Sequence, residues 1–291
     1  MVLNRRRFIY CELGDVIRMS GRLGKNFQLL INAISAIETV DSIGKSGGKA
    51  LPESNESDID VFIFCSSTPA KDIRKAAIDS LGELVTSSRF GDAEGRFWGT
   101  IDFITMNDTE ICLMYFTMEK TNAEINTILS GERIMREDEY FYPTGRCASI
   151  LSMCILFDKD GYISGLKDRV SFFPAELAKK LIAYHVKKIN DEEDFERSVS
   201  RKDVLFYHAT LENAMDHYLQ ALFALNRTFF PSRKRSIQFI NEFAVKPVDC
   251  ANRILKTVKL GADYETLTQS YNIWSALCND LTDEIDRAVL A

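Results

Sequence analysis

The sequence has little of what zinc sites, disulfide frameworks and membrane spans are made from. Only 3 of its 291 residues are histidine, and its 7 cysteines are odd in number and scattered along the chain. Neither set has the close spacing of zinc ligands, and scattered cysteines in apolar surroundings favour reduced thiols over disulfides. No apolar run approaches the roughly 18 residues that a membrane helix needs. We therefore expect a soluble globular protein without zinc, disulfides or a membrane span.

An excess of positive charge is also missing. The chain holds 36 Lys and Arg against 42 Asp and Glu, which gives a formal net charge of −6. Neither residues 1–135 nor residues 136–291 contain more basic than acidic side chains. Because nucleic-acid binders usually carry a net basic domain, a nucleic-acid substrate is disfavoured. The basic start at residues 4–10 is followed by Glu12 and Asp15, which does not fit a signal peptide, and we expect a cytoplasmic protein.

The hydrophobic pattern predicts a mixed α/β domain over residues 1–138. Helices are expected over 15–37, 68–85 and 119–129, and strands over 40–43, 58–65, 97–106 and 110–117. The corner Asn107-Asp108 between the last two strands predicts an antiparallel hairpin.

Residues 139–291 are expected to form a second, helical domain. The predicted helices cover 144–157, 174–190, 201–226, 233–260 and 264–290. The predicted fold class is therefore α+β, with an N-terminal mixed sheet flanked by helices and a C-terminal helical bundle.

Two carboxylates open the strand predicted over 58–65. Side chains at positions i and i+2 of a strand point the same way, so Asp58 and Asp60 are expected side by side. Two anions held so close repel each other unless a cation lies between them or one is protonated. The upstream Gly47 and Gly48 let the backbone approach a bulky group such as a triphosphate. This pattern indicates a metal-dependent phosphoryl or nucleotidyl transfer site.

An aspartate also interrupts the apolar strand predicted over 97–106. Asp102 is flanked by isoleucine and phenylalanine, and a charge buried there without a partner costs several kcal/mol. If this strand lies beside the strand of Asp58 and Asp60, Asp102 completes a metal site of three carboxylates. Such hard oxygen ligands select Mg²⁺ over softer metals.

Together these motifs resemble the signature of the polymerase-β-type nucleotidyltransferase superfamily: a Gly-Gly or Gly-Ser turn, a strand with Asp-x-Asp or Asp-x-Glu, and a third acid on a later strand. The matching residues are Gly47-Gly48, Asp58-Ile59-Asp60-Val61 and Ile101-Asp102-Phe103. The C-terminal half also resembles a two-domain bacterial branch that is similar in layout to the lincosamide and aminoglycoside nucleotidyltransferases. The segments that carry this second resemblance are 156–161, 173–174, 201–203, 222–226 and 230–234.

The resemblance implies transfer of a nucleoside monophosphate from a nucleoside triphosphate (NTP) to a hydroxyl group of a small molecule, with release of pyrophosphate. It implies that Asp58 and Asp60 hold Mg²⁺ on the triphosphate. Asp102 would share a second Mg²⁺ or take the proton of the acceptor hydroxyl. An acceptor of the aminoglycoside or lincosamide kind is suggested by the layout, and a cationic acceptor would suit an acidic site.

The implied nucleotide-binding residues come from both domains. In the first, backbone N–H groups of Gly47 and Gly48 would reach the β- and γ-phosphates, helped by Ser46 and by Lys49 or Lys45. The residues implied in the helical domain are Arg201, Asp203, Asn226 and Lys234. For these four, salt bridges or helix caps within the domain are an equally open interpretation.

Other functions stay open at this point. Gly48 stands where many members of the superfamily carry serine, which leaves room for a catalytically degenerate nucleotide-binding protein. An antitoxin-like or protein-modifying nucleotidyltransferase is another alternative. An RNA-tailing enzyme is a third, and the missing basic domain counts against it. The motifs leave the acceptor, the nucleobase and the oligomeric state open.

Overall fold

The structure is a computed structural model that describes residues 21–46, 58–92, 95, 97–137 and 141–290. The chain divides into two compact units. The sheet unit comprises Met1–Asn126 and Cys147–Phe172, and the helical unit comprises Thr127–Arg146 and Phe173–Ala291. This division differs from the single boundary expected after residue 138, because the segment Cys147–Phe172 returns to the first unit.

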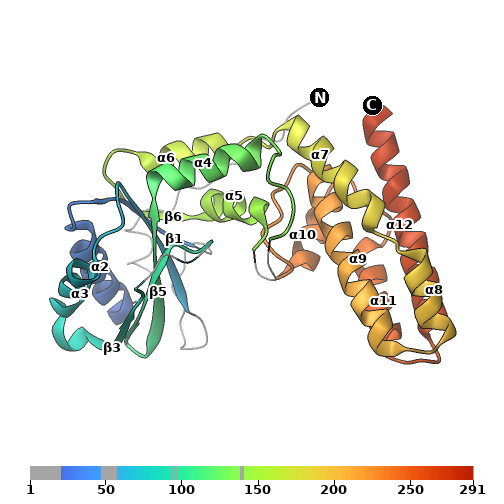
Figure 1. Cartoon of the computed structure of the whole chain (residues 1–291), viewed down its shortest axis with the longest axis horizontal. Coiled ribbons are helices and arrows are strands. Elements are labelled where there is room, and N and C mark those ends of the chain that lie inside the picture. Colours follow the sequence, from blue (N-terminus) through green and yellow to red (C-terminus); the bar gives the residue numbers. More distant parts are fainter. Residues whose placement is uncertain (1–20, 47–57, 93–94, 96, 138–140, 291) are drawn as a thin grey trace. The chain divides into compact units, whose positions relative to one another are not determined.

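A mixed six-stranded sheet forms the centre of the sheet unit (Figure 1). The strands are β1 (Val40–Lys45), β2 (Ile59–Cys65), β3 (Val85–Phe90), β4 (Thr100–Met106), β5 (Thr109–Thr117) and β6 (Cys154–Asp158). Their order across the sheet is β3-β4-β5-β2-β1-β6. The central strands β2 and β5 run parallel to each other, and all other neighbours are antiparallel. Beyond Asp60 every residue of β2 is buried, as expected for a strand that is covered on both faces.

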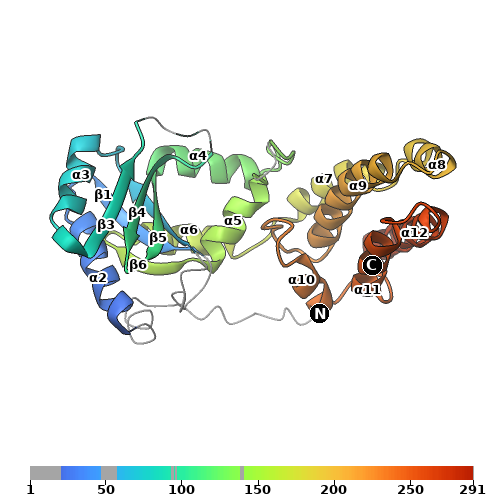
Figure 2. The same cartoon turned by 90° about the horizontal axis from the view of Figure 1, so that it is seen from below.

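Helices cover both faces of this sheet (Figure 2). Those of the unit are α2 (Gly21–Ser35), α3 (Lys71–Asp79), the 3₁₀ turn η1 (Gly82–Leu84) and α6 (Tyr162–Val170), while α4 (Met118–Leu129) and α5 (Pro143–Ser152) each span a boundary between the units. On one face, Phe27 and Ile31 of α2 pack with Val61 of β2 in a single hydrophobic core. On the other face, the ring of Tyr162 from α6 lies 5.4 Å from the ring of Phe64 on β2. We call these the α2/α3 face and the α6 face.

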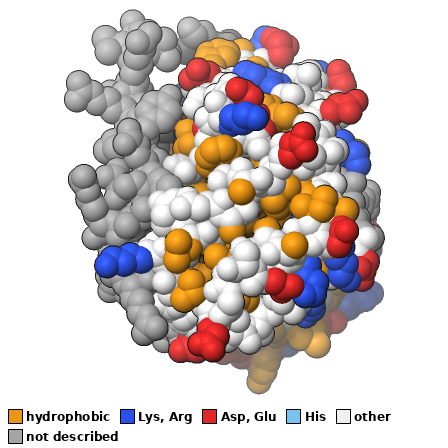
Figure 3. Space-filling view, turned by 90° about the vertical axis from the view of Figure 1, so that its left-hand side faces the viewer, with side chains coloured by type: hydrophobic (Ala, Val, Ile, Leu, Met, Phe, Trp, Pro, Cys, Tyr) orange, Lys and Arg blue, Asp and Glu red, His pale blue; other side chains and the backbone are white. Residues whose placement is uncertain are grey.

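On the outer side of α2 and α3, the exposed hydrophobic side chains of the described residues are scattered (Figure 3). Figure 3 views this side of the unit, and hydrophobic side chains are scattered there among uncharged groups, with Lys, Arg, Asp and Glu around them. Leu29 and Ile73 are the exposed large hydrophobic residues of these two helices. Single exposed hydrophobic residues such as these two are normal on a protein surface.

The predicted hairpin is confirmed. β4 and β5 pair antiparallel up to Met106 opposite Thr109. Between them Asn107 and Asp108 have φ angles of 51° and 58°. A two-residue connection with both φ angles positive matches the right-handed twist of the flanking strands, and Asn and Asp tolerate it better than most residues.

Two predicted helices end early, and each is followed by a strand. The helix predicted over 68–85 ends at Asp79, and β3 then runs along the edge of the sheet with most of its residues exposed. Gly82, with a φ of 57°, separates the two elements. The helix predicted over 144–157 ends at Ser152, and β6 pairs with β1 instead. A short apolar run fits either period, and here the free edge of β1 takes it as a strand.

The helical unit has a hydrophobic core of its own around α9. Its elements are α7 (Ala175–His185), the 3₁₀ turn η2 (Val186–Lys188), α8 (Glu192–Ser200), α9 (Val204–Leu225), α10 (Ser236–Glu242), α11 (Cys250–Leu260) and α12 (Leu267–Leu290). Tyr218 and Leu222 of α9 pack in this core with Trp274 of α12. The helix predicted over 233–260 is two helices, because Pro247 lacks an N–H group and Asp249 has a φ of 55°.

The predicted α+β fold class is confirmed, with a mixed sheet flanked by helices and a C-terminal helical region. Across the described part of the chain, no helix combines the length and the apolar character that crossing a membrane requires.

Candidate functional site

Asp58 and Asp60 lie at the start of β2, where the buried part of that strand begins. Ile59 and Val61, which alternate with them, belong to the core on the α2/α3 face. The two carboxylates therefore lie on the α6 face. Asp58 is exposed and Asp60 is half-buried, so this end of the strand is open to solvent on the α6 face.

Strand β5 adds a thiol and a further carboxylate beside this pair. Cys112 lies opposite Asp60 in the parallel register. Asp58, Asp60 and Cys112 each offer one ligand atom, and these three atoms lie within 4.8 Å of one another. Glu110, two residues before Cys112 and hence on the same face, is exposed. We call these four residues the acidic face.

The thiol of Cys112 is held in its neutral form. Burial, and after it the negative charges of Asp60 and Asp58, raises the pKa of Cys112 to about 12. Low polarity and neighbouring anions both disfavour a thiolate, so the proton stays on sulfur near neutral pH unless a cation replaces it.

Arg89 borders the acidic face, whereas Lys45 interacts with Asp60 from the end of β1, where the register turns its side chain to the α2/α3 face. The guanidinium of Arg89 on β3 lies 4.4 Å from the ring centre of Phe103 on β4, a cation–π contact that holds the side chain in place. Arg89 is exposed, and its charge opposes the rise in the pKa of Cys112. Lys45 at the end of β1 is buried, and that burial lowers its pKa while the charge of Asp60 opposes the shift.

The predicted phosphate loop begins next to the acid pair. The N–H group of Ser46 donates to the carbonyl of Asp60 over 2.9 Å, which ties the chain to β2 as it leaves β1. Gly47, Gly48 and Lys49 lie outside the described residues, and their contact with phosphates stays a prediction.

The structure does not bring Asp102 to the acid pair. Asp102 lies opposite Leu113 of β5, and Leu113 belongs to the core on the α2/α3 face. Its side chain therefore points away from the face that carries Asp60. There Asp102 is fully buried and forms an ion pair with Arg74 of α3, which is itself only 3% exposed. The expected third metal ligand is thus part of the core, because strand alternation places it on the wrong face.

Arg74 makes this burial tolerable. Its Nε donates to the carbonyl of Pro69 over 3.1 Å and its Nη2 to the carbonyl of Gly91 over 2.8 Å. The N–H of Gly91 in turn donates to Asp102 over 3.1 Å. Burial raises the pKa of Asp102, and the hydrogen bond and charge of Arg74 oppose that rise. Both charges are hydrogen-bonded, Asp102 through its Oδ1 atom, while its buried Oδ2 has no hydrogen-bond partner among the described residues.

The four residues predicted to bind nucleotide in the helical unit do not form one set. Asp203 begins α9, where its carboxylate accepts the N–H of Phe206 over 3.0 Å. Asn226 ends the same helix and bonds both the N–H and the carbonyl of Val245. The 22 residues of α9 separate these two caps by roughly 33 Å, longer than one nucleotide.

The helix-cap interpretation therefore applies to Asp203 and Asn226, and the two residues cannot contact the same nucleotide; a contact of either one alone stays a prediction. Both side chains form hydrogen bonds with backbone groups at the ends of α9. Arg201 and Lys234 are exposed, and a role for them in binding stays a prediction.

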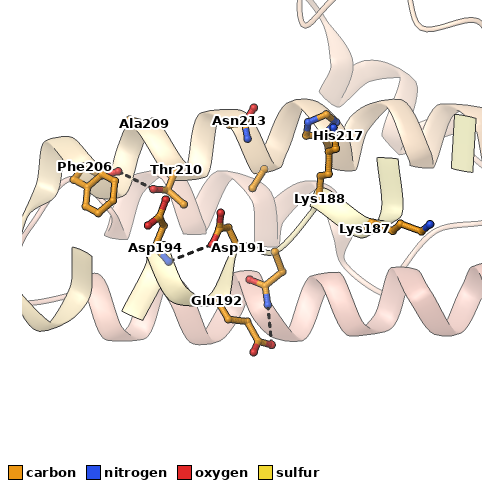
Figure 4. Close-up of a pocket in the computed structure, with 12 residues that line it drawn as sticks. Lys187, Lys188, Asp191, Glu192, Asp194, Phe206, Ala209, Thr210, Asn213 and His217 are labelled. Atoms are coloured by element: carbon orange, nitrogen blue, oxygen red, sulfur yellow. Dashed lines mark hydrogen bonds between the residues drawn. The ribbon is translucent and has the colours of Figure 1, made fainter. Parts of the chain in front are cut away.

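A groove of about 910 Å³ opens in the helical unit between η2, α8 and α9 (Figure 4). Several of its charged side chains have local partners. Asp191 accepts the N–H of Asp194 at the start of α8 over 3.2 Å, and the ammonium of Lys188 lies 4.1 Å from the ring centre of Tyr184. Capping and local contacts account for these three residues.

A histidine pair lies at the edge of this groove. The Nδ1 atoms of His185 and His217 are 2.7 Å apart, so one donates and the other accepts. Burial, and after it the neighbouring His217, lowers the pKa of His185 to about 3. Burial also lowers the pKa of His217. Both rings are therefore neutral at physiological pH.

A buried polar cluster in the helical unit holds residues 230–233 against α9. Asp216 accepts from the hydroxyl of Tyr142 over 2.5 Å and from Nε of Arg233 over 2.7 Å. Beside it, the hydroxyl of Thr144 donates to the carbonyl of Phe230 over 3.1 Å. These bonds join the two ends of the segment 142–235.

Sequence reasoning missed Cys112, Glu110 and Arg89. The spacing Glu110-x-Cys112 repeats that of Asp58-x-Asp60, which is the one local signal that these residues could share a face. Which strand lies beside β2, and in which register, depends on pairing between distant segments.

Comparisons with known proteins give a partial match to one family model and two structural likenesses. A family model described as a domain of unknown function (DUF4037) matches residues 142–235, which include the Asp216 cluster but not the acidic face. No protein with a curated description matches the chain.

The chain is similar to the crystal structure of a nucleotidyltransferase-like protein from Exiguobacterium sibiricum 255-15, with a TM-score of 0.46 and 10% identity; the match covers 91% of this chain and 77% of that one. It is also similar to the soluble domain of CorA from Methanocaldococcus jannaschii, with a TM-score of 0.17 and 10% identity over 86% of this chain and 97% of that one. At such TM-scores and identities, neither likeness assigns a function.

Proposed function

We propose that this chain is a divalent-cation-dependent nucleotidyltransferase that moves a nucleoside monophosphate from an NTP to a hydroxyl group of a small molecule. The observation that carries the proposal is the pair Asp58 and Asp60 at the open start of β2, with ligand atoms within 4.8 Å of each other and of Cys112. Two anions at this distance repel each other. Folding gains nothing from that repulsion, whereas a bound cation relieves it.

The donor atoms of the acid pair fit Mg²⁺. Proteins bind this ion through one or two carboxylates together with the phosphates of a substrate, and Asp58 and Asp60 offer two carboxylates on a face open to solvent. They would hold Mg²⁺ against the triphosphate of a bound nucleotide. When bound, the ion would neutralise charge on the phosphates and support displacement at the α-phosphorus.

Other side chains of the same face would position the reactants. Arg89, held on the ring of Phe103, presents a guanidinium that suits phosphate oxygens. Glu110 is an exposed carboxylate on this face. In place of Asp102, it would act as the base that accepts the proton of the acceptor hydroxyl.

The acceptor would be a cationic small molecule. Asp58, Asp60 and Glu110 give this end of the sheet a local excess of negative charge, which attracts amino-bearing compounds and repels polyanions. An amino-sugar of the aminoglycoside kind combines positive charge with several hydroxyl groups, and it is the first class to screen.

The test is transfer of label from an α-labelled NTP in the presence of Mg²⁺. We expect the double variant Asp58→Asn/Asp60→Asn to lose transfer by on the order of 100-fold or more, equivalent to several kcal/mol of transition-state stabilisation. The matched control is Asp79→Asn/Glu83→Gln, which removes two exposed charges from the α3 side of the same unit. The control variant should keep full transfer.

The site of the label discriminates between the functions. Label on an amino-sugar or a similar compound supports the proposal, whereas label on protein supports a protein-modifying enzyme and an extended RNA primer supports a tailing enzyme. Nucleotide binding without transfer supports a binding-only protein. Transfer that survives the double change would remove the acidic face from the chemistry.

A further inference from the structure

Cys112 is a buried thiol that faces an open pair of carboxylates. Its side chain is 8% exposed and lies across from Asp60, with its sulfur on the same face. Among the described residues the thiol has no hydrogen-bond partner, and Cys112 is in no disulfide. A polar atom that is buried, unpartnered and directed at two anions is suited to bind a cation.

The geometry of the three side chains is close to that of a metal site. Their ligand atoms lie within 4.8 Å of one another. Around a tetrahedral Zn²⁺ with bonds of about 2.0–2.3 Å, neighbouring ligand atoms are about 3.5 Å apart. Small side-chain rotations therefore suffice to bring the two oxygens and the sulfur onto one ion, and the backbone register already places them.

A sulfur atom changes which ion such a site prefers. Mg²⁺ takes oxygen ligands in octahedral geometry and does not favour thiolate. Thiolate is a soft ligand that selects ions such as Zn²⁺, and a set of two oxygens and one sulfur with an open fourth position is compatible with tetrahedral Zn²⁺ and one water. The spacing of the cysteines in the sequence does not reveal this metal site, because its three ligands come from two different strands.

We propose that Asp58, Asp60 and Cys112 together bind a thiophilic divalent cation such as Zn²⁺, and that this ion competes with Mg²⁺ for the two carboxylates. On binding, a metal–sulfur bond forms and the thiol proton leaves to solvent; no electron transfer is involved. The bound ion would occupy the position that Mg²⁺ needs, and so would switch the site off. Only this last consequence rests on the proposed function, since metal binding itself does not.

The test of binding is a titration of the purified full chain with Co²⁺, whose coordination by a thiolate gives a sulfur-to-cobalt absorption band. We expect the band in the wild type and in Cys65→Ser. Cys65 is the matched control, because it is buried on β2 but faces the α2/α3 core instead of the acid pair. The band should vanish in Cys112→Ser, and its half-saturation should move at least tenfold higher in Asp58→Asn/Asp60→Asn.

Two variants guard against loss of the fold. Cys112→Ser is nearly isosteric and Cys112→Ala removes the polar atom, and far-ultraviolet circular dichroism will show that each is folded. An unchanged cobalt–sulfur band in either folded variant overturns the proposal. A band of the same affinity in the folded Asp58→Asn/Asp60→Asn variant overturns it as well, because the carboxylates would then not be ligands.

Competition is measured without any activity. Excess Mg²⁺ should shift the Co²⁺ titration of the wild type to higher concentration, and a titration that ignores Mg²⁺ overturns the competition. If no acceptor is ever labelled but the Cys112-dependent band appears, the proposed function fails and the metal site stands. If label is transferred, Zn²⁺ should inhibit the wild type at least tenfold more strongly than Cys112→Ser. Equal inhibition would refute the switch.

Discussion

Replacing Asp102 by alanine separates a structural role from a catalytic one. Asp102 is fully buried and Arg74 is 3% exposed, so the change leaves a guanidinium in the core without its anion. Breaking a buried ion pair in this way costs about 3–5 kcal/mol. Coulomb's law gives a similar figure, about 4 kcal/mol for two charges roughly 4 Å apart at an effective dielectric constant of 20. Since domains are stable by about 5–15 kcal/mol, Asp102→Ala should remove roughly a fifth or more of the stability of the sheet unit.

Urea denaturation provides the assay. The chain has two tryptophans, Trp98 in the sheet unit and Trp274 in the helical unit, so the fluorescence reports on both. Asp102→Ala should lower the midpoint of the sheet unit only. The double change Arg74→Met/Asp102→Leu replaces both charges by apolar groups and should recover most of the loss. By contrast, Asp58→Asn/Asp60→Asn should leave the midpoint unchanged or raise it, because it relieves repulsion.

One result would refute this reasoning. Suppose that Asp102→Ala unfolds at the wild-type urea concentration but transfers no label. Then Asp102 acts in the chemistry, and its ion pair with Arg74 does not contribute to the stability of the sheet unit. If the activity of Asp102→Ala instead falls only where the variant unfolds, the residue is a core residue, as its register indicates.

Three further predictions concern other polar groups. Although burial raises the pKa of Asp158, its hydrogen bonds to Ser164 and to other neighbours outweigh burial, so the pKa is lowered. Asp158→Asn should therefore cost about 0.5–2 kcal/mol of stability at neutral pH. Because the folded-state pKa is depressed, the stability difference from the wild type should shrink below about pH 4, which thermal melts at several pH values will show. The pKa of His185 is lowered to about 3, so on acidification its imidazole takes up a proton in the unfolded chain but not in the folded chain. The stability should therefore fall as the pH drops from about 6.5 toward 3. His185→Gln should flatten this fall, and an unchanged pH profile would contradict the prediction. Tyr142→Phe removes the hydroxyl that donates to buried Asp216 over 2.5 Å and should destabilise the helical unit by about 1.5–3 kcal/mol in urea, whereas no change would mean that the bond contributes nothing.

Local rules predicted the elements whose signal lies within a few residues. The paired orientation of Asp58 and Asp60 follows from the two-residue period of a strand, and the hairpin at Asn107 and Asp108 follows from turn chemistry. Helix capping is equally local, which is why a cap was an open interpretation for Asp203 and Asn226.

The parts that failed depend on pairing between distant segments. Asp102 was expected beside the acid pair, but β5 lies between β4 and β2, and the register of β4 turns its aspartate to the other face. A shift of one residue would have reversed that outcome. The same pairing brings Cys112 to Asp60, which no pattern within either strand could reveal. The strand β6 was missed because its short apolar run reads equally as a helix end.

The return of β6 to the sheet makes the unit indivisible by a single cut. A polypeptide that stopped at residue 138 would lack β6 and expose the N–H and C=O groups along one edge of β1. Such an edge is a template for pairing with a second molecule, so the shortened protein should aggregate. Thr127–Arg146 belongs to the helical unit but lies in the sequence between the two segments of the sheet unit. The chain therefore has no single position at which a cut would separate the two units.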